Sequence, residues 1–255
     1  MKINPNILRK KVIDMVVAKQ SGHIGGAFSM AELTAVLYED YDIGGKDKLI
    51  LSKGHAVPII YAVLHELGKI TDEELDLFRE IDSPLQGHPD KLRLPLMDAT
   101  TGSLGQGLSI AIGHSYGKNL SDDCGTVFCV LGDGELQEGQ VWEALMHYPM
   151  SGLSNLVCII DWNKAQNDGY SDEFSIMYDN LKERITSFGW DTRLVNGHDM
   201  DLIRSTLTLK EYGKPLCIIL DTVKGKGVSF MEDPAWHCKV PTEEEYEIAM
   251  KELGV

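Results

Sequence analysis

Short apolar runs alternate with longer amphipathic segments along most of this chain. The short runs contain many β-branched residues and predict strands at 48–52, 126–131, 156–160, 192–195 and 215–220. The longer segments carry apolar residues at helical spacing and predict helices at 6–20, 57–67, 108–118, 137–150, 180–188, 199–209 and 242–253. Buried strands that alternate with helices are typical of an α/β fold, with a mostly parallel central sheet covered by helices on both faces.

Two further helices are predicted from their first residues. Ser29 is followed three positions later by Glu32, and Thr71 is followed in the same way by Glu74. Both pairs fit a capping box, in which the two side chains bond the free N–H groups of the first helical turn. These boxes predict helices that run to about Asp40 and about Arg79. The segment 81–101 has no such pattern, and a loop of this length inside a compact domain is usually functional.

Length and composition indicate an ordinary globular protein. The chain has 255 residues, of which 43% are hydrophobic and 25% charged. This is enough for one large α/β domain. We find no internal repeat, low-complexity segment or linker, so a single domain is expected over 1–255.

The charge balance and the cysteines restrict the class further. A net charge of −15 argues against nucleic acid or an anionic membrane surface as partner, although a local basic pocket stays possible. Three of the five cysteines lie in apolar runs and no CxxC pair occurs, which is typical of free buried thiols in a reducing cytosol. Neither a signal peptide nor a membrane span is recognisable, so a cytoplasmic protein is expected.

The chemistry starts where two predicted strands end. The run 126–131 leads into Gly132-Asp133-Gly134, and the run 156–160 leads into a polar turn with Asn163, 30 positions after Asp133. That interval has room for a helix and a return strand, so both side chains can reach one crevice at the sheet edge. Oxygen ligands of this kind suit Mg²⁺, which often shares its remaining ligands with phosphates. A plain strand-ending turn is the alternative for Gly-Asp-Gly taken alone.

A dinucleotide site is not indicated. The glycine-rich segment 102–107 reads G-x-x-G-x-G, and it follows an irregular loop instead of the first strand. A Rossmann fingerprint has the order G-x-G-x-x-G directly after that strand. Asp133 would also repel a bare pyrophosphate unless a metal ion lay between them.

Together, these motifs resemble those of transketolases. Gly132-Asp133-Gly134 with Asn163 looks like the thiamine diphosphate motif, and further matches follow in the family's order over roughly residues 10 to 240. They are Ser21-Gly22-His23, Lys53-Gly54-His55-Ala56, Gly87-His88-Pro89, Gly102-Ser103-Leu104-Gly105-Gln106-Gly107, Glu138-Gly139 with Trp142-Glu143-Ala144, the segment 222–227, and Trp236-His237. The resemblance implies the thiamine diphosphate-binding fold. It covers the diphosphate-binding half of a transketolase and not the pyrimidine-binding half.

The resemblance also implies a ligand set for the metal and the cofactor. Asp133, Asn163 and the backbone carbonyl of Ala165 would hold Mg²⁺, with Ca²⁺ or Mn²⁺ as alternatives. The amide of Gly134 would donate to a phosphate oxygen. The remaining residues implied to contact thiamine diphosphate are His55, Gly102, Ser103, Leu104, Glu138 and His237.

Catalytic roles follow from the same resemblance. His23 and His88 would contact substrate hydroxyls, and His237 would lie close to the reacting end of the cofactor. Glu138 and Glu143 resemble carboxylates that face the partner's activating glutamate. Histidine suits acid–base work near neutral pH. The other histidines, His65, His114, His147 and His198, have structural positions in or beside predicted helices.

The function implied is transfer of a two-carbon ketol unit from a ketose to an aldose, both sugar phosphates, in carbohydrate metabolism of the pentose phosphate type. The chain would be the N-terminal subunit of a two-subunit enzyme, active with a pyrimidine-domain subunit in an α2β2 heterotetramer. One alternative is an acyloin-forming subunit like 1-deoxyxylulose-5-phosphate synthase. Another is a non-catalytic regulatory paralogue, against which the retained Asp133, Asn163 and Glu138 argue.

Three positions depart from the family's usual pattern. Ile24 replaces a proline after His23, Cys238 replaces a glycine after His237, and Trp162 precedes Asn163 where an acid or amide is common. None of them removes an expected cofactor ligand. They are compatible with an unusual sugar as substrate.

Overall fold

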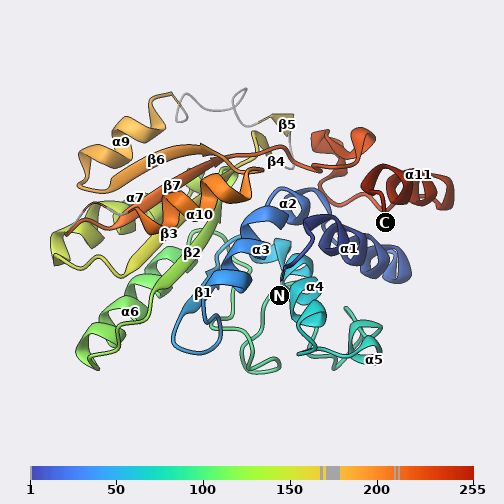
Figure 1. Ribbon diagram of the computed structural model, residues 1–255, viewed down its shortest axis with the longest axis horizontal. Coiled ribbons are helices and arrows are strands. Elements are labelled where there is room, and N and C mark those ends of the chain that lie inside the picture. The colour runs from blue at the N-terminus through green and yellow to red at the C-terminus, as the bar shows by residue number, and fades with distance from the viewer. Residues whose placement is uncertain (1, 167–168, 171–178, 210, 212) are drawn as a thin grey trace.

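A five-stranded parallel sheet forms the centre of the molecule, with the order β1-β2-β3-β7-β6 (Figure 1). This computed structural model describes residues 2–166, 169–170, 179–209, 211 and 213–255. The strands are β1 (Lys48–Leu51), β2 (Val127–Gly132), β3 (Leu156–Trp162), β6 (Asp191–Asn196) and β7 (Leu216–Asp221). Each coincides with a predicted strand, and the α/β fold class is confirmed.

Helices cover both faces of the sheet, because successive strand residues point to opposite sides. On one face, Phe128, Val130 and their neighbours pack with α1 (Pro5–Lys19), α3 (Ala31–Asp40), α4 (Pro58–Glu66), α10 (Met200–Thr208) and α11 (Glu243–Leu253). On the other face, Cys129 and Leu131 pack with α6 (Gly107–Leu120), α7 (Gly139–His147) and α9 (Leu181–Ser187). Figure 1 shows these two helical layers on either side of the strands.

Short elements connect the layers. Besides α2 (Gly25–Phe28) and α5 (Asp72–Leu75), 3₁₀ turns occur at η1 (Gly54–Ala56), η2 (Gly134–Gln137), η3 (Tyr148–Ser151), η5 (Ser229–Met231) and η6 (Pro234–Trp236). A separate antiparallel pair joins β4 (Ala165–Gln166) to β5 (Gly169–Tyr170). The segment 81–101 contains neither helix nor strand, as predicted.

The two predicted capping boxes have different outcomes. Thr71 and Glu74 form the box, but α5 ends at Leu75 instead of near Arg79. The prediction of a capping box at Ser29 was wrong. Helix α3 starts at Ala31, and the Ser29 hydroxyl donates to the Gly26 carbonyl and to Asp161. Tertiary partners thus outcompete the local cap.

Glu32, the other half of the failed box, is also engaged elsewhere. Its carboxylate accepts a hydrogen bond from Arg9 at 2.7 Å and contacts His198 at 3.0 Å. The predicted helix 137–150 is likewise divided, into η2, α7 and η3. These differences shift element ends and leave the predicted order of elements intact.

The structure also bears on the cysteines and on the prediction about membrane spans. Cys129, Cys158 and Cys217 are buried in strands, and all five cysteines are free. Within the residues that the structure describes, no helix is both long and apolar enough to cross a bilayer.

Candidate active site

A cavity of about 360 Å³ opens where β1, β2, β3 and β7 end. All four strands run in the same direction, so the loops that follow them meet at one edge of the sheet. The cavity is lined by His23, Gly26, Lys53, His55, His88, Gly102, Leu104, Gly132, Asp133, Gly134, Glu135, Asn163, Ala165, Gln166, Lys224 and His237. Ten of the thirteen residues expected from the sequence are among them.

Asp133 lies at the end of β2 with 2% of its surface exposed. Its carboxylate accepts hydrogen bonds from the Gly134 amide at 2.8 Å and from the Lys164 amide at 2.7 Å. Burial raises the pKa of Asp133 to about 6, and the nearby Asp161 adds to the rise. A cation beside this buried carboxylate would stabilise its charged form.

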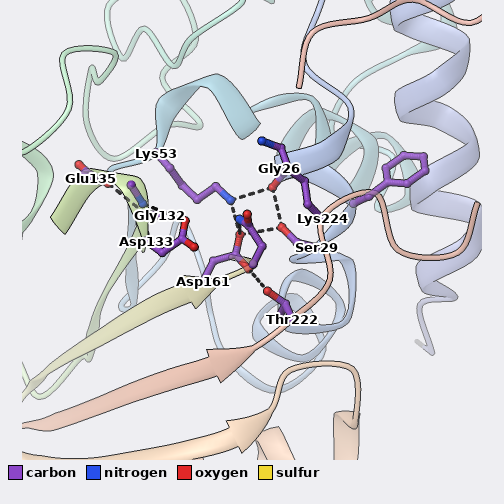
Figure 2. Close-up of polar contacts among 12 residues, drawn as sticks. Gly26, Ser29, Lys53, Gly132, Asp133, Glu135, Asp161, Thr222 and Lys224 are labelled. Atoms are coloured by element: carbon purple, nitrogen blue, oxygen red, sulfur yellow. Dashed lines mark hydrogen bonds and ion pairs between the residues drawn. The ribbon is translucent and has the colours of Figure 1, made fainter. Parts of the chain in front are cut away.

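Asn163 is oriented by a buried carboxylate behind it. Asp161, within β3, accepts hydrogen bonds from Ser29 at 2.6 Å, Thr222 at 2.5 Å and the Asn163 side-chain nitrogen at 2.8 Å. Figure 2 shows Ser29, Lys53 and Thr222 converging on Asp161. Because the nitrogen of Asn163 is engaged by Asp161, its Oδ1 is left on the side of Ala165, whose amide it accepts at 3.2 Å.

Lys53 forms a buried ion pair with Asp161 and donates to the Gly26 carbonyl at 2.9 Å. Burial alone would raise the pKa of Asp161, but the ammonium of Lys53 and the hydroxyl donors outweigh burial and lower it. Asp161 therefore stays ionised and keeps its four donors in place.

A second lysine reaches the cavity from the loop after β7. Lys224 donates to the Ala165 carbonyl at 3.2 Å and to Nδ1 of His237 at 2.8 Å. Burial, followed by repulsion from Lys53, lowers the pKa of Lys224 to about 8. Since Nδ1 of His237 accepts this bond, its proton sits on Nε2, where it can be donated to a ligand.

Four histidines form a cluster on the wall of the cavity. The ring centroid of His23 lies 5.4 Å from that of His55, 6.3 Å from that of His88 and 5.2 Å from that of His237. Burial is the main cause of a lowered pKa at each, to about 4 at His23 and about 3 at His237. All four are therefore neutral at physiological pH and can both donate and accept hydrogen bonds.

Glu135 joins the glycine-rich loop to the end of β2. Its buried carboxylate accepts from the Ser52 hydroxyl, from the Gly105 amide at 2.8 Å and from the Gly132 amide at 3.2 Å. Gly105 itself has a φ of 86°, a conformation that favours glycine. These bonds bring Gly102 and Leu104 to the cavity wall.

Three expected residues do not line the cavity. Ser103, Glu138 and Glu143 are exposed on the surface, while their neighbours Leu104 and Gly105 turn inward.

The three positions that depart from the family's usual pattern lie in different surroundings. Ile24 is buried in the core, and Cys238 is exposed beside His237. Trp162 is partly buried and lies under the ammonium of Lys164, 5.0 Å from the ring centroid.

Sequence reasoning assigned no role to five residues that shape the site, namely Lys53, Glu135, Asp161, Gln166 and Lys224. Lys53 and Lys224 stand in recognised motifs, so their motif position was an available signal. Asp161 precedes Asn163 by two positions, which in a strand places both side chains on one face. Burial of an acid in an apolar run is a signal for an ion pair.

The donor set fits a divalent cation and a phosphorylated ligand. Carboxylate, carboxamide and carbonyl oxygens from Asp133, Asn163 and Ala165 suit Mg²⁺. Among the described residues, no three His, Cys, Asp or Glu side chains form a metal cluster, so further oxygens would have to come from a ligand. Nδ1 of His23 is buried without a hydrogen-bond partner in the described part of the chain, and it is free to bond such a ligand.

Glycines leave room for that ligand against the backbone. A Cβ on Gly134 would lie 3.1 Å from the Gln166 side chain, and one on Gly102 would lie 3.4 Å from His88. The separation at Gly134 is tighter than an ordinary contact, and the one at Gly102 is already van der Waals contact, so a larger side chain at either position would crowd the cavity. The cavity, its oxygen donors and its neutral histidines define an α/β domain that can hold a phosphorylated ligand through a divalent cation.

The comparison with protein families agrees with this class. Residues 2–255 match the family described as transketolase, thiamine diphosphate binding domain. The chain belongs to the transketolase family, and a transferase activity of the transketolase type follows from that membership.

Two curated relatives align almost end to end with this chain. The 6-deoxy-6-sulfo-D-fructose transketolase subunit SqwG of Clostridium sp. (strain MSTE9) is 37% identical, over 97% of this chain and 94% of the relative. A subunit of the apulose-4-phosphate transketolase of Phocaeicola vulgatus is also 37% identical, over 96% of this chain and 91% of the relative.

A solved structure shows the same fold. The transketolase from Campylobacter jejuni superposes with a TM-score of 0.89 at 31% identity, covering 98% of this chain. The match covers 42% of the Campylobacter chain, so this chain corresponds to less than half of it.

Proposed function

We propose that this chain is the diphosphate-binding subunit of a two-subunit, Mg²⁺-dependent transketolase that moves a two-carbon ketol unit from a ketose to an aldose. The observation that carries the proposal is the nearly complete mutual coverage with two proteins named as transketolase subunits. Only part of the Campylobacter transketolase corresponds to this chain, which also supports a need for further residues. The free cysteines agree with a cytoplasmic enzyme.

The residues present would anchor the cofactor by its diphosphate. Asp133, the oriented oxygen of Asn163 and the Ala165 carbonyl would bind the cation, and the Gly134 amide would donate to a phosphate oxygen. Bound thiamine diphosphate supplies the electron sink for carbon–carbon cleavage. Asp161 and Lys53 keep Asn163 in position.

The histidine cluster would handle the substrate. His23, His55, His88 and His237 are neutral, so each can donate one hydrogen bond and accept another from sugar hydroxyls. The rings of the other three lie 5.2–6.3 Å from that of His23 at one end of the cavity, so one sugar could contact several of them. His88, the most exposed of the four, would meet the substrate first.

A pyrimidine-domain subunit would complete the site. Glu138 and Glu143 are exposed beside the cavity on the segment η2–α7, where a partner could reach them. The partner would supply the activating glutamate, and an α2β2 assembly would contain two such sites. Sugar phosphates or related anionic sugars are the proposed substrates, in line with the names of the relatives.

The test is reconstitution. We expect no ketol transfer by the purified chain, and transfer from a ketose phosphate to an aldose phosphate once the pyrimidine-domain subunit, thiamine diphosphate and Mg²⁺ are added. Robust transfer by the single chain would overturn the two-subunit proposal. Turnover of pyruvate but not of hydroxypyruvate would indicate an acyloin-forming enzyme instead. An intact complex that binds no cofactor in calorimetry would indicate a regulatory paralogue.

A further inference from the structure

A histidine outside the cavity contacts the backbone segment that carries Lys224 into it. His198 lies in the turn between β6 and α10. This turn packs closely on the segment after β7, since the Gly197 amide donates to the Asp221 carbonyl at 2.9 Å and a Cβ on Gly197 would lie 2.3 Å from the Thr222 side chain. His198 is therefore next to the chain directly before Lys224.

Both ring nitrogens of His198 are engaged, and each connects the ring to a different part of the fold. Nδ1 lies 3.0 Å from a carboxylate oxygen of Glu32 in α3, and Nε2 accepts the Val223 amide at 2.9 Å. An accepting Nε2 carries no proton, so the ring proton sits on Nδ1 and is donated to Glu32. Because 14% of the side chain is exposed, water competes little for these bonds.

Glu32 fixes this arrangement of the ring. Its carboxylate also accepts from Arg9 of α1 at 2.7 Å, and both side chains are buried. Burial alone would raise the pKa of Glu32, but the bond from His198 and the charge of Arg9 outweigh burial and lower it. An ionised Glu32 can only accept, so it keeps the proton of His198 on Nδ1 and leaves Nε2 as the acceptor for Val223.

The bond to the Val223 amide fixes the chain directly before Lys224. On the other side of the lysine, the Gly225 amide donates to the Gly25 carbonyl at 3.1 Å. A Cβ on Gly25 would lie 2.8 Å from Cγ of Lys224, so the stem of the lysine passes close to this glycine. Lys224 is thus held from both sides, with 3% of its surface exposed.

The ammonium placed in this way orients two groups of the cavity. Lys224 donates to the Ala165 carbonyl, an expected metal ligand, and to Nδ1 of His237. Without the second bond, the proton of His237 is free to move to Nδ1, and Nε2 then no longer donates to a ligand. The position of the backbone at Val223 therefore bears on the chemistry of the cavity.

We propose that His198 is a positioning residue of this active site, which holds Lys224 in the cavity by binding the Val223 backbone from outside. Through Arg9 and Glu32, helices α1 and α3 are then connected to the cavity by a continuous chain of hydrogen bonds. The inference rests on the proposed function as far as cofactor binding is concerned. The alternative is a purely structural histidine, which only ties α10 to α3.

Two variants separate these roles, because each keeps one of the two bonds. His198→Gln places a carbonyl oxygen near the position of Nε2, where it can accept the Val223 amide. His198→Asn places an amide nitrogen near the position of Nδ1, where it can still donate to Glu32. A positioning role predicts that the glutamine variant is rescued and the asparagine variant is not.

Two measurements follow the effect. In the purified chain, we expect deuterium exchange of the segment 222–227 to become about 3–10-fold faster in His198→Asn. In the reconstituted complex, calorimetry should show the Kd for thiamine diphosphate with Mg²⁺ raised by a similar factor. For His198→Gln, both quantities should change less than about twofold.

His65→Asn is the matched control. The side chain of His65 is 15% exposed, and its ring nitrogens likewise contact two partners, Lys11 at 2.8 Å and Asp72 at 2.7 Å. His65 lies outside the set of residues that line the cavity. This variant should therefore leave both the exchange of 222–227 and the cofactor affinity unchanged.

The asparagine and glutamine variants also define the results that would overturn the proposal. A larger loss in His198→Gln than in His198→Asn, or equal losses in both, would show that the bond to Glu32 is what matters. Unchanged exchange in His198→Asn would overturn the proposal as well. If the unmodified complex binds no thiamine diphosphate, the proposed function fails, while the exchange rates of the purified chain still decide the role of His198.

Discussion

Lys53 and Asp161 form an ion pair at the base of the cavity, with 1% and 0% of their side chains exposed. Lys53 follows β1 and Asp161 belongs to β3, so the pair reaches across the end of β2, where Asp133 lies. The same carboxylate holds Asn163 at 2.8 Å. The ion pair thus orients Asn163, one of the three expected metal ligands, from behind.

Breaking this pair should destabilise the chain strongly. Lys53→Met leaves Asp161 buried without its cation, and we expect a loss of about 3–5 kcal/mol in the free energy of unfolding. Urea denaturation followed by circular dichroism measures it. Lys10→Met is the control, because Lys10 and Asp14 form a pair that is 38% and 34% exposed, and its loss should cost less than about 1 kcal/mol. Similar losses in both variants would contradict the assigned role of the buried pair.

Asp133→Asn should raise the stability of the metal-free chain while weakening its binding of metal and cofactor. The pKa of Asp133 is raised from 3.8 to about 6, so in the metal-free chain its charged form opposes folding. Protonated Asp133 thus contributes to the free energy of unfolding. This contribution is fully present below pH 3.8 and is lost as the pH rises through 6. Replacing the carboxyl should therefore stabilise the metal-free chain by about 1–3 kcal/mol at pH 8, with no gain at pH 4.

The same variant should also lose the stabilisation that bound thiamine diphosphate and Mg²⁺ give to the complex. We expect thiamine diphosphate with Mg²⁺ to raise the melting temperature of the unmodified complex by mass action, and Asp133→Asn to abolish most of this rise. EDTA should have the same effect on the unmodified complex. A variant that is less stable without metal, or that keeps the full ligand-induced rise, would contradict the assignment of Asp133.

Acid should destabilise the protein through the histidine cluster. The pKa of His23 is lowered to about 4 and that of His237 to about 3, so the folded chain binds fewer protons than the unfolded chain. The stability that follows is present above the ordinary pKa of 6.5 and is lost as the pH falls toward 4. His23→Gln, which has no proton to gain, should lose less stability between about pH 7 and pH 5 when measured by urea denaturation. An identical pH dependence in both proteins would argue against a neutral His23.

Periodicity was enough to predict the sheet, because strands buried on both faces leave little choice of element. Cys129 and Leu131 face one layer, Phe128 and Val130 the other, and the sequence of this run is apolar throughout. The failure at Ser29 has a different origin. Its hydroxyl bonds Asp161, 132 positions away, and a local pattern cannot register such a partner.

The site was predictable only as far as motifs order its residues. Asp133 and Asn163 could be paired from the strand pattern, whereas the four histidines depended on the family resemblance. Arg79 was placed at the end of a predicted helix, but α5 stops at Leu75 and the chain turns into a left-handed residue instead. Such a turn depends on the tertiary bonds of the following loop, and local propensity does not encode it.

Gly105 should tolerate no side chain. Its φ of 86° costs alanine about 1–2 kcal/mol, and a Cβ would meet that of Glu138 at 2.8 Å. Gly105→Ala should therefore lower the free energy of unfolding and weaken thiamine diphosphate binding by the complex, because the loop carrying Gly102 and Leu104 is displaced. Gly117→Ala is the control, since a Cβ there meets nothing within 4 Å in an exposed part of α6 and should stabilise the chain by about 0.5–1 kcal/mol. Equal stability and equal cofactor binding in Gly105→Ala and Gly117→Ala would contradict this prediction. The close approach of Gly105 to Glu138 would then not be what positions the loop.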